Sequence, residues 1–186
     1  VEPANDSNIF RKCNVIEPYG GCNFNKAEIL TQTSLAPAWF RTEVTAKPGL
    51  TEARLYLSAL GYGIPWVNGE LADDGLLSPP QSDYEDYAYY STRDITKFLK
   101  QGFNTLSVLL DGGWYHEVGG FGVNASYGRP GLKALVFLKY DDGSTEYISS
   151  GTGWDWKEGA IRSCNIYRGS RVDYRLDHDE WKNVNY

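Results

Sequence analysis

The segment that decides the fold is 132–150, LKALVFLKYDDGSTEYISS, which has the pattern of a β-hairpin. Its two arms are rich in apolar, β-branched and aromatic residues, which favour strands. Asp142-Gly143 stands between the arms, and Asp-Gly accepts the backbone angles of a tight hairpin turn. This is the clearest hairpin in the chain, and we expect further strands on both sides of it.

Other short strand patterns recur along the chain at intervals of about 8 to 12 residues. In the first, Phe40 and Val44 fall near one face while Arg41 and Glu43 fall near the other, as in a half-buried strand. Asn68-Gly69 is a second turn dipeptide, because both residues tolerate positive φ. The expected strands lie within 39–46, 53–60, 64–70, 87–92 and 104–115, with two or three more in 154–176.

Only one segment, 94–100 (DITKFLK), predicts a helix, with Asp94 as its N-cap and Gly102 following its end. Strands do not alternate with helices, so a parallel nucleotide-binding sheet is excluded. No repeat of the length found in propellers or solenoids is present. The pattern therefore predicts an all-β protein, a jelly-roll β-sandwich with one short helix.

The chain is expected to hold one such domain and to be a piece of a longer polypeptide. Residues 1–37 are polar and turn-rich with no sustained period, and they read as an irregular N-terminal lead-in. Residues 38–186 form the predicted β-sandwich domain. The 186-residue sequence opens on Val1 and contains no methionine, which indicates processing or excision from something longer.

Composition excludes several classes of partner. The chain has 18 basic and 24 acidic residues, a net charge of −6, and no basic run, which argues against nucleic acid and anionic membrane surfaces. No apolar stretch is long enough for a transmembrane helix. The apolar share of 41% argues against disorder. Six Trp and 14 Tyr suit both strand packing and stacking on sugar rings.

The three cysteines, Cys13, Cys22 and Cys164, do not form a CxxC motif, so a zinc site is not indicated. They are either free, mostly structural thiols or include a Cys13–Cys22 bridge. With His116 and His178 as the only histidines, no Cys/His catalytic pair is suggested by spacing.

Two long loops carry the residues that could perform chemistry. Segment 70–87 is rich in carboxylates without Lys or Arg, and segment 116–131 has five glycines among Phe, Tyr, Asn and Arg. Glycoside hydrolysis needs two carboxyl groups facing one bond, but solvated loop charge is the alternative reading of these residues. The candidate carboxylates are Asp73, Asp74, Asp83, Glu85, Asp86, Asp111 and Glu117. No GxSxG nucleophile motif is present.

A calcium site is a further possibility. Ca²⁺ prefers oxygen ligands, which Asp73 and Asp74 offer as carboxylates, and Asn124 and the carbonyls at and before Pro130 offer as neutral groups. Two adjacent carboxylates repel each other unless a cation or an Arg lies between them. An exposed pair in a turn is the other interpretation.

Taken in order, the runs 53–79, 82–115, 124–146 and 166–181 resemble the N-terminal β-sandwich region of bacterial α-L-rhamnosidases. The resemblance extends from about Trp39 to Trp181. It implies a jelly-roll module ahead of an (α/α)₆ catalytic barrel that carries the general acid and base. This piece would therefore not be catalytic alone, although its parent chain looks like a glycoside hydrolase.

In some members of that family the module looks like a Ca²⁺-dependent L-rhamnose-binding domain. Residue by residue, the resemblance implies metal ligands at Asp73 or Asp74, Asn124 and Pro130. The family pattern changes at Gln81 and Tyr87, where Trp and Arg are usual, and at Ser170, where an acidic residue is usual, while Asp173 and Arg175 are retained. The predicted carbohydrate-binding residues are Asp73, Asp74, Trp114, Tyr115, Phe121, Asn124, Tyr127 and Arg129.

Three functions remain open from the sequence. The first is a non-catalytic module that binds rhamnose-containing glycans with Ca²⁺, its partners being the carbohydrate and a downstream catalytic domain. The second is a ligand-free structural module that braces that catalytic domain. The third is an independent sandwich hydrolase. Glycan scavenging implies a periplasmic or extracellular location.

Overall fold

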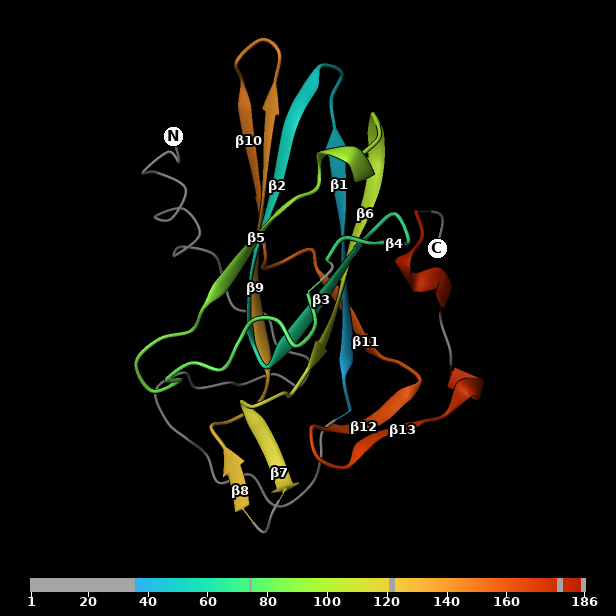
Figure 1. The fold of residues 1–186 in the computed structure, drawn as a ribbon. Helices are drawn as coiled ribbons and strands as arrows, with labels where there is room; N and C mark the ends of the chain where they lie inside the picture. The colour runs from blue at the N-terminus through green and yellow to red at the C-terminus, as the bar shows by residue number, and fades with distance from the viewer. Residues whose placement is uncertain (1–35, 74, 121–122, 177–178, 185–186) are drawn as a thin grey trace.

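The computed structural model describes residues 36–73, 75–120, 123–176 and 179–184, and it is a sandwich of antiparallel strands (Figure 1). Several residues named above lie outside the described part: most of the lead-in with Cys13 and Cys22, and also Asp74, Phe121 and His178. In the part that is described, no helix has the length and apolar character needed to cross a membrane.

Two sheets make up the sandwich. The five-stranded sheet has the order β11-β1-β6-β3-β4, and the four-stranded sheet has the order β10-β9-β2-β5. The strands of the first are β1 (Ala38–Ala46), β3 (Tyr62–Val67), β4 (Glu70–Leu71), β6 (Gly102–Asp111) and β11 (Asp155–Glu158). Those of the second are β2 (Leu50–Leu60), β5 (Tyr90–Asp94), β9 (Gly131–Tyr140) and β10 (Thr145–Ser149). The predicted all-β sandwich is confirmed.

Two smaller hairpins lie at the lower end of the sandwich in Figure 1. One pairs β7 (His116–Gly120) with β8 (Val123–Ser126), and the other pairs β12 (Ile161–Asn165) with β13 (Gly169–Val172). Two short 3-10 turns follow, η2 (Tyr174–Leu176) and η3 (Asp179–Lys182). The loops that carry the predicted aromatic site residues therefore meet at one end of the fold.

The core lies between the sheets and follows from the period-two pattern of the strands. Phe40 and Val44 of β1 face inward from one sheet, and Leu55 and Leu57 of β2 face inward from the other, all 1% exposed or less. Each fully buried side chain of this size contributes about 1.5–3 kcal/mol to folding. The predicted alternation in 39–46 is confirmed for Phe40 and Val44, which face the core. Arg41 was expected on the solvent face, but it is buried because residues near the C-terminus, Asn183 among them, cover it.

Both predicted turn dipeptides are confirmed. Gly143 has a φ of 82° and donates its N–H to the carbonyl of Tyr140 at 3.0 Å, which closes the β9–β10 hairpin. Asn68 and Gly69 have φ angles of 53° and 84° and join β3 to β4. These are the positions where the sequence supplies residues that accept the left-handed region.

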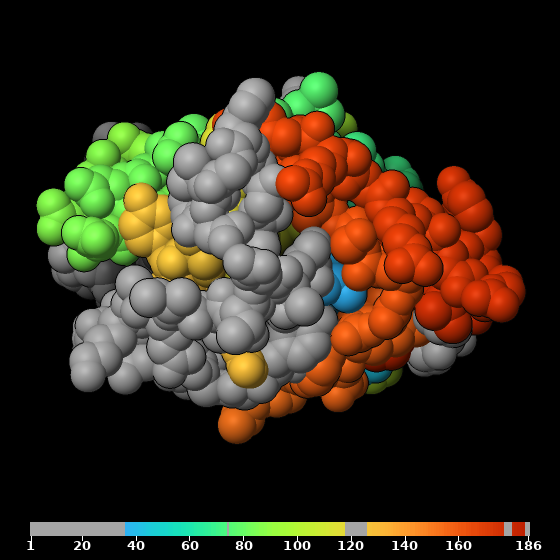
Figure 2. Space-filling model, turned by 90° about the horizontal axis from the view of Figure 1, so that it is seen from below, coloured from blue at the N-terminus to red at the C-terminus, as the bar shows by residue number. Residues whose placement is uncertain are grey.

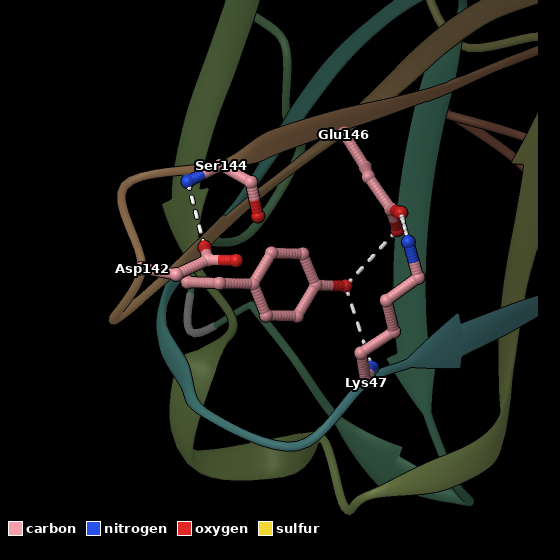
Figure 3. Close-up of polar contacts among 5 residues, drawn as sticks. Lys47, Asp142, Ser144 and Glu146 are labelled. Carbon is pink, nitrogen blue, oxygen red and sulfur yellow. Dashed lines mark hydrogen bonds and ion pairs between the residues drawn. The ribbon is translucent and has the colours of Figure 1, made fainter.

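A polar network fixes the turn end of the β9–β10 hairpin, opposite the two small hairpins (Figures 1 and 3). The buried Tyr140 hydroxyl donates to Glu146 Oε2 at 3.0 Å and accepts from the backbone N–H of Lys47 at 3.4 Å. The Lys47 ammonium forms an ion pair with Oε1 of Glu146. The network thus ties β1's end to the hairpin.

The predicted helix is shorter than expected. It is a single 3-10 turn, η1 (Thr96–Phe98), with Ile95 rather than Asp94 at the N-cap position. Asp94 still accepts a hydrogen bond from the backbone N–H of Thr96 at 2.9 Å. Ile95 is fully buried, and the Thr96 hydroxyl accepts from the Ala53 N–H at 2.8 Å, so tertiary contacts hold this turn against β2.

Candidate functional site

The structure separates the predicted site residues into two places. Five of them, Trp114, Tyr115, Tyr127, Arg129 and Pro130, lie in the loops that flank the β7–β8 hairpin at the lower end (Figure 1). Asp73 lies in the loop that follows β4, at the edge of the five-stranded sheet. Asn124 pairs with Val118 within that hairpin, and its side chain lies outside the described part, as do Asp74 and Phe121.

Asp73 is held by Arg93. Its side chain is 2% exposed, its Oδ1 lies 2.8 Å from Nε of Arg93, and its Oδ2 accepts from Nη2 at 2.9 Å. Oδ1 also accepts from the Gly75 N–H at 2.7 Å. The ion pair joins the loop after β4, at the edge of one sheet, to β5, at the edge of the other. Arg93 therefore supplies the positive charge that the sequence offered as the alternative to a cation.

This arrangement bears on calcium binding. Both oxygens of Asp73 are used by a guanidinium and a backbone N–H, so Asp73 does not fit a metal ligand in this geometry. Across residues 36–73, 75–120, 123–176 and 179–184, no three or more His, Cys, Asp and Glu side chains are grouped to hold a metal. Pro130 is buried beside the lower-end hairpin.

Three tyrosines form a packed cluster at the lower end. The rings of Tyr115 and Tyr127 stack with centroids 5.9 Å apart, and Tyr84 meets both edge-on, at 5.0 and 5.3 Å. Tyr115 is only 6% exposed, and its hydroxyl donates to the Tyr127 carbonyl at 3.3 Å. Tyr115, which was predicted to contact a sugar, is thus the buried member of this cluster. Tyr84, which was not among the predicted site residues, is its third member.

Tyr62, on β3, is a further buried tyrosine, close to Tyr84 of this cluster. It is 5% exposed, and among the described residues its hydroxyl has no hydrogen-bond partner. Burial raises the pKa of Tyr62 to about 12, and the nearby Tyr84 and Asp111 add to the shift. Gly113, at φ 46°, passes directly over the ring, where a Cβ would lie 3.0 Å from ring carbons. A buried hydroxyl of this kind is stabilised by any polar group that reaches it.

A second aromatic pair lies at the surface of the same end. The rings of Trp114, after β6, and Tyr167, in the β12–β13 turn, meet edge-on with centroids 5.7 Å apart, and Tyr167 is 47% exposed. Asn165 positions that turn, because its Oδ1 accepts from the N–H groups of Tyr167 and Arg168, both at 2.9 Å. Its amide donates to Oε1 of the buried Glu117 at 2.6 Å, which ties the turn to β7.

Tyr167 and Asn165 were not selected from the sequence, although NIYRG within the expected strand region has the residues of a turn. Trp114 and Tyr167 are far apart in the chain, and only the fold brings them together. The pair presents aromatic surface to solvent next to a hydrogen-bonded carboxylate and amide, a combination that suits a polar ligand with apolar faces.

Two of the remaining candidate carboxylates, Asp83 and Asp111, have local partners, whereas Glu85 and Asp86 are exposed. Asp83 accepts from the Glu85 N–H at 3.3 Å, and Asp111 accepts from the Gly112 N–H at 2.7 Å. Such contacts are typical of aspartates that stabilise turns. Asp73 is likewise bound by Arg93, and Glu117 by Asn165. These four carboxylates therefore have structural partners, and no two of them face a common position where a bond could be cleaved.

The departures from the family pattern lie at the surface. Gln81 is exposed, and Tyr87 is 51% exposed beside Tyr89. Ser170 Oγ lies 3.2 Å from the Cys164 sulfur, and burial raises the pKa of that thiol. The retained residues Asp173 and Arg175 form a two-point ion pair, with nitrogen–oxygen distances of 2.8 and 2.6 Å.

The chain is similar to proteins of one known family. Residues 49–186 match the family described as the alpha-L-rhamnosidase N-terminal domain. An alpha-L-rhamnosidase of Formosa agariphila is 33% identical over 163 residues, which cover 81% of this chain and 16% of that protein. One of Streptomyces avermitilis is 35% identical over 133 residues, covering 71% of this chain and 13% of that protein.

Solved structures agree. The crystal structure of native α-L-rhamnosidase from Aspergillus terreus superposes with a TM-score of 0.86 at 30% identity, over 99% of this chain and 20% of that one. The α-L-rhamnosidase of Streptomyces avermitilis, complexed with L-rhamnose, superposes with a TM-score of 0.78 at 31% identity, over 82% and 15%. The chain thus spans 13–20% of the length of these proteins.

Proposed function

Because this chain belongs to the alpha-L-rhamnosidase N-terminal domain family, we propose that it is a non-catalytic module of a longer α-L-rhamnosidase and that it binds rhamnose-containing glycans. The observation that carries the binding proposal is the Trp114–Tyr167 pair at the lower end of the sandwich. It is an aromatic surface assembled from two separate loops and positioned by the Asn165–Glu117 hydrogen bond.

The chemistry of this pair suits a deoxy sugar. Aromatic ring faces pack against sugar C–H groups, and the methyl group of rhamnose adds apolar area to that contact. Polar groups beside the rings fix the orientation of the sugar hydroxyls. Tyr127 and the half-buried Arg129 lie in the loop after β8, at the same end of the molecule.

The non-catalytic role is supported by four of the candidate carboxylates. Asp73, Asp83, Asp111 and Glu117 each have a structural partner close by. Two carboxyl groups that share one glycosidic bond are needed for hydrolysis. We therefore expect no turnover of an aryl rhamnoside by this chain, and measurable turnover would contradict the proposal.

Calcium dependence is a separate part of the proposal. Asp73 is already paired with Arg93 here, so the predicted ligands left to test are Asp74, Asn124 and Pro130. The variant D74N tests this directly, since it removes one carboxylate charge and leaves the Asp73–Arg93 pair untouched. If rhamnose binds equally well with Ca²⁺ and with a chelator, calcium has no part in binding.

Titration calorimetry with L-rhamnose tests the binding site. Wild type should give a binding heat that W114A loses. W156A is the matched control, because Trp156 is another partly exposed tryptophan, 44% exposed on β11. Absence of heat for wild type with and without Ca²⁺, or equal heats for W114A and W156A, would reject the site.

A second candidate function is to brace a catalytic domain, and the exposed segment from β13 to η2 favours it. The segment from β13 to η2 exposes apolar side chains, with Val172 38%, Tyr174 79% and Leu176 39% exposed. Exposed apolar groups in one segment often mark contacts with another domain. In a longer rhamnosidase that carries this domain, Y174A should then lower the thermal midpoint, while the same change leaves this chain's own stability unaltered.

A further inference from the structure

A second aromatic surface lies at the start of β5 and has no part in the site described above. Tyr87, Tyr89 and Tyr90, here called the tyrosine strip, are 51%, 45% and 50% exposed. The rings of Tyr87 and Tyr89 meet edge-on with centroids 5.3 Å apart, and Tyr90 lies 6.3 Å from the buried Tyr56. Three half-exposed rings are thus gathered within four residues.

The strip is on a different side of the molecule from the Trp114–Tyr167 pair. Seen from below, the green segment that leads into β5 and the orange-red β12–β13 region occupy opposite sides (Figure 2). A ligand on one surface therefore does not depend on the other. The strip also borders β5, which is an edge strand of the four-stranded sheet.

The backbone of the strip is already fixed. The Tyr87 N–H donates to the Asp83 carbonyl at 2.8 Å, the Ser58 hydroxyl donates to the Tyr89 carbonyl at 2.8 Å, and Tyr90 pairs with Ser58 of β2. Ordering a flexible loop on binding costs free energy, and a surface held in this way avoids most of that cost. Tyrosine adds to the effect, because its side chain has few rotatable bonds.

Charge and polarity select the type of ligand. The segment 70–92 contains no Lys or Arg, and Asp83, Glu85 and Asp86 precede the strip, so an anionic ligand would be repelled. The Tyr87 and Tyr89 hydroxyls lie 3.5 Å apart, which places two neutral hydrogen-bonding groups beside the ring faces. The hydrogen bond with the Tyr89 side chain raises the pKa of Tyr87, so the Tyr87 hydroxyl stays neutral at physiological pH.

We propose that the tyrosine strip is a second carbohydrate-binding surface, which takes the neutral sugar units of a glycan chain by stacking on Tyr87, Tyr89 and Tyr90. Neutral sugars combine apolar C–H faces with hydroxyl groups, and the strip offers the matching ring faces and hydroxyls. Two separate surfaces would let one domain hold a polysaccharide at two points, which increases overall affinity.

Affinity electrophoresis with a neutral polysaccharide that contains rhamnose tests the proposal. Y87A/Y89A should bind the polysaccharide about tenfold more weakly than wild type, and Y87F/Y89F, which keeps the rings, should lose less. Both double variants should retain the calorimetric heat with monomeric L-rhamnose, whereas W114A should lose that heat and keep part of the polysaccharide binding. Loss of polysaccharide binding alone thus reports on the tyrosine strip, and loss of the L-rhamnose heat alone reports on the Trp114 site.

Two outcomes would overturn the proposal that the tyrosine strip binds carbohydrate. One is equal retardation of wild type and Y87A/Y89A in the gel. The other is a wild-type dimer in sedimentation analysis that Y87A/Y89A dissociates, because the strip would then be an interface between two copies along the edge strand. If the alanine variant does not fold, the wild-type backbone amide resonances of residues 87–90 must shift when neutral oligosaccharides of the same polysaccharide are added. Unchanged resonances would reject the surface.

Discussion

At the scale of single residues, the network around Glu146 makes stability depend on pH (Figure 3). Hydrogen bonds from Lys47 and Tyr140 hold the pKa of Glu146 below its usual value of 4.5. A carboxyl group whose pKa falls on folding stabilises the fold above its unfolded pKa, and this contribution is lost as the pH falls through the folded pKa. The stability of wild type relative to E146Q should therefore shrink as the pH drops below about 4.5.

The same network acts in the opposite direction at high pH. The Glu146 contact raises the pKa of Lys47 above 10.5, and burial raises the pKa of Tyr140 above 10.0. Both contributions are complete below the unfolded pKa values and are lost as the pH rises through the folded ones. Urea midpoints of wild type and E146Q from pH 3 to pH 11 measure the Glu146 and Lys47 contributions, since the burial of Tyr140 is common to both proteins. E43Q, at an exposed position of β1, is the control, and a constant difference between wild type and E146Q would contradict the assignment.

The Asp73–Arg93 pair is a residue-scale contact with a larger expected effect. Removal of one partner leaves the other charge poorly compensated, and Asp73 is almost fully buried. D73N should lower the free energy of unfolding by about 1–3 kcal/mol. A double-mutant cycle with R93Q isolates the pair, since the double variant should lose less than the sum of the single ones. Additive losses would show that the two side chains do not interact.

At the scale of elements, the two turn glycines offer a matched comparison. Gly69 and Gly143 have nearly equal φ angles, 84° and 82°, so alanine costs about 1–2 kcal/mol of backbone strain at each. An added Cβ at Gly143 meets nothing within 4 Å, whereas at Gly69 it contacts the Asn183 side chain. G69A should therefore destabilise more than G143A in urea unfolding. The second change N183A should remove that excess, and equal costs for G69A and G143A would contradict the contact.

Elements that depend on local sequence could be predicted, and those that depend on tertiary contacts could not. The β9–β10 hairpin was predicted because its turn dipeptide and strand residues are contiguous. The helix over 94–100 was too long in the prediction, because Ile95 packs into the core and Thr96 bonds to β2. In the site, Trp114 was predicted from its loop, but Tyr167 was missed because only the fold brings the β12–β13 turn to it.

Asp73 shows the same limit for charged residues. The sequence indicated that a positive group should lie near the adjacent carboxylates, but the nearest candidates along the chain gave no reason to choose Arg93. That residue lies 20 positions later and on the other sheet. Long-range ion pairs of this kind follow from strand order, which periodicity does not encode.

At the scale of the whole molecule, the proposed binding surface and the stabilising contacts lie in different parts. The Trp114–Tyr167 pair, here called the aromatic rim, lies at the lower end, whereas η3 covers the outer face of the five-stranded sheet. The Trp181 ring has the Lys157 ammonium 4.1 Å and the Arg41 guanidinium 5.6 Å from its centroid. Its carbonyl accepts from the Ser107 hydroxyl at 3.4 Å, and that of Asn183 accepts from Arg41 at 3.2 Å.

These contacts predict that W181A destabilises the entire domain. Each cation–π contact is worth about 0.5–1 kcal/mol at a partly exposed site, and the lost ring burial adds to this, so the free energy of unfolding should fall by about 2–3 kcal/mol. Y174A, on the neighbouring and highly exposed η2, is the control and should change it by less than about 0.5 kcal/mol. Because Trp181 lies on a sheet face rather than at the aromatic rim, W181A should keep the L-rhamnose heat of wild type below its unfolding temperature. Equal stabilities of W181A and Y174A would show that η3 does not hold the sheet, and loss of the rhamnose heat in folded W181A would show that sheet and rim are coupled.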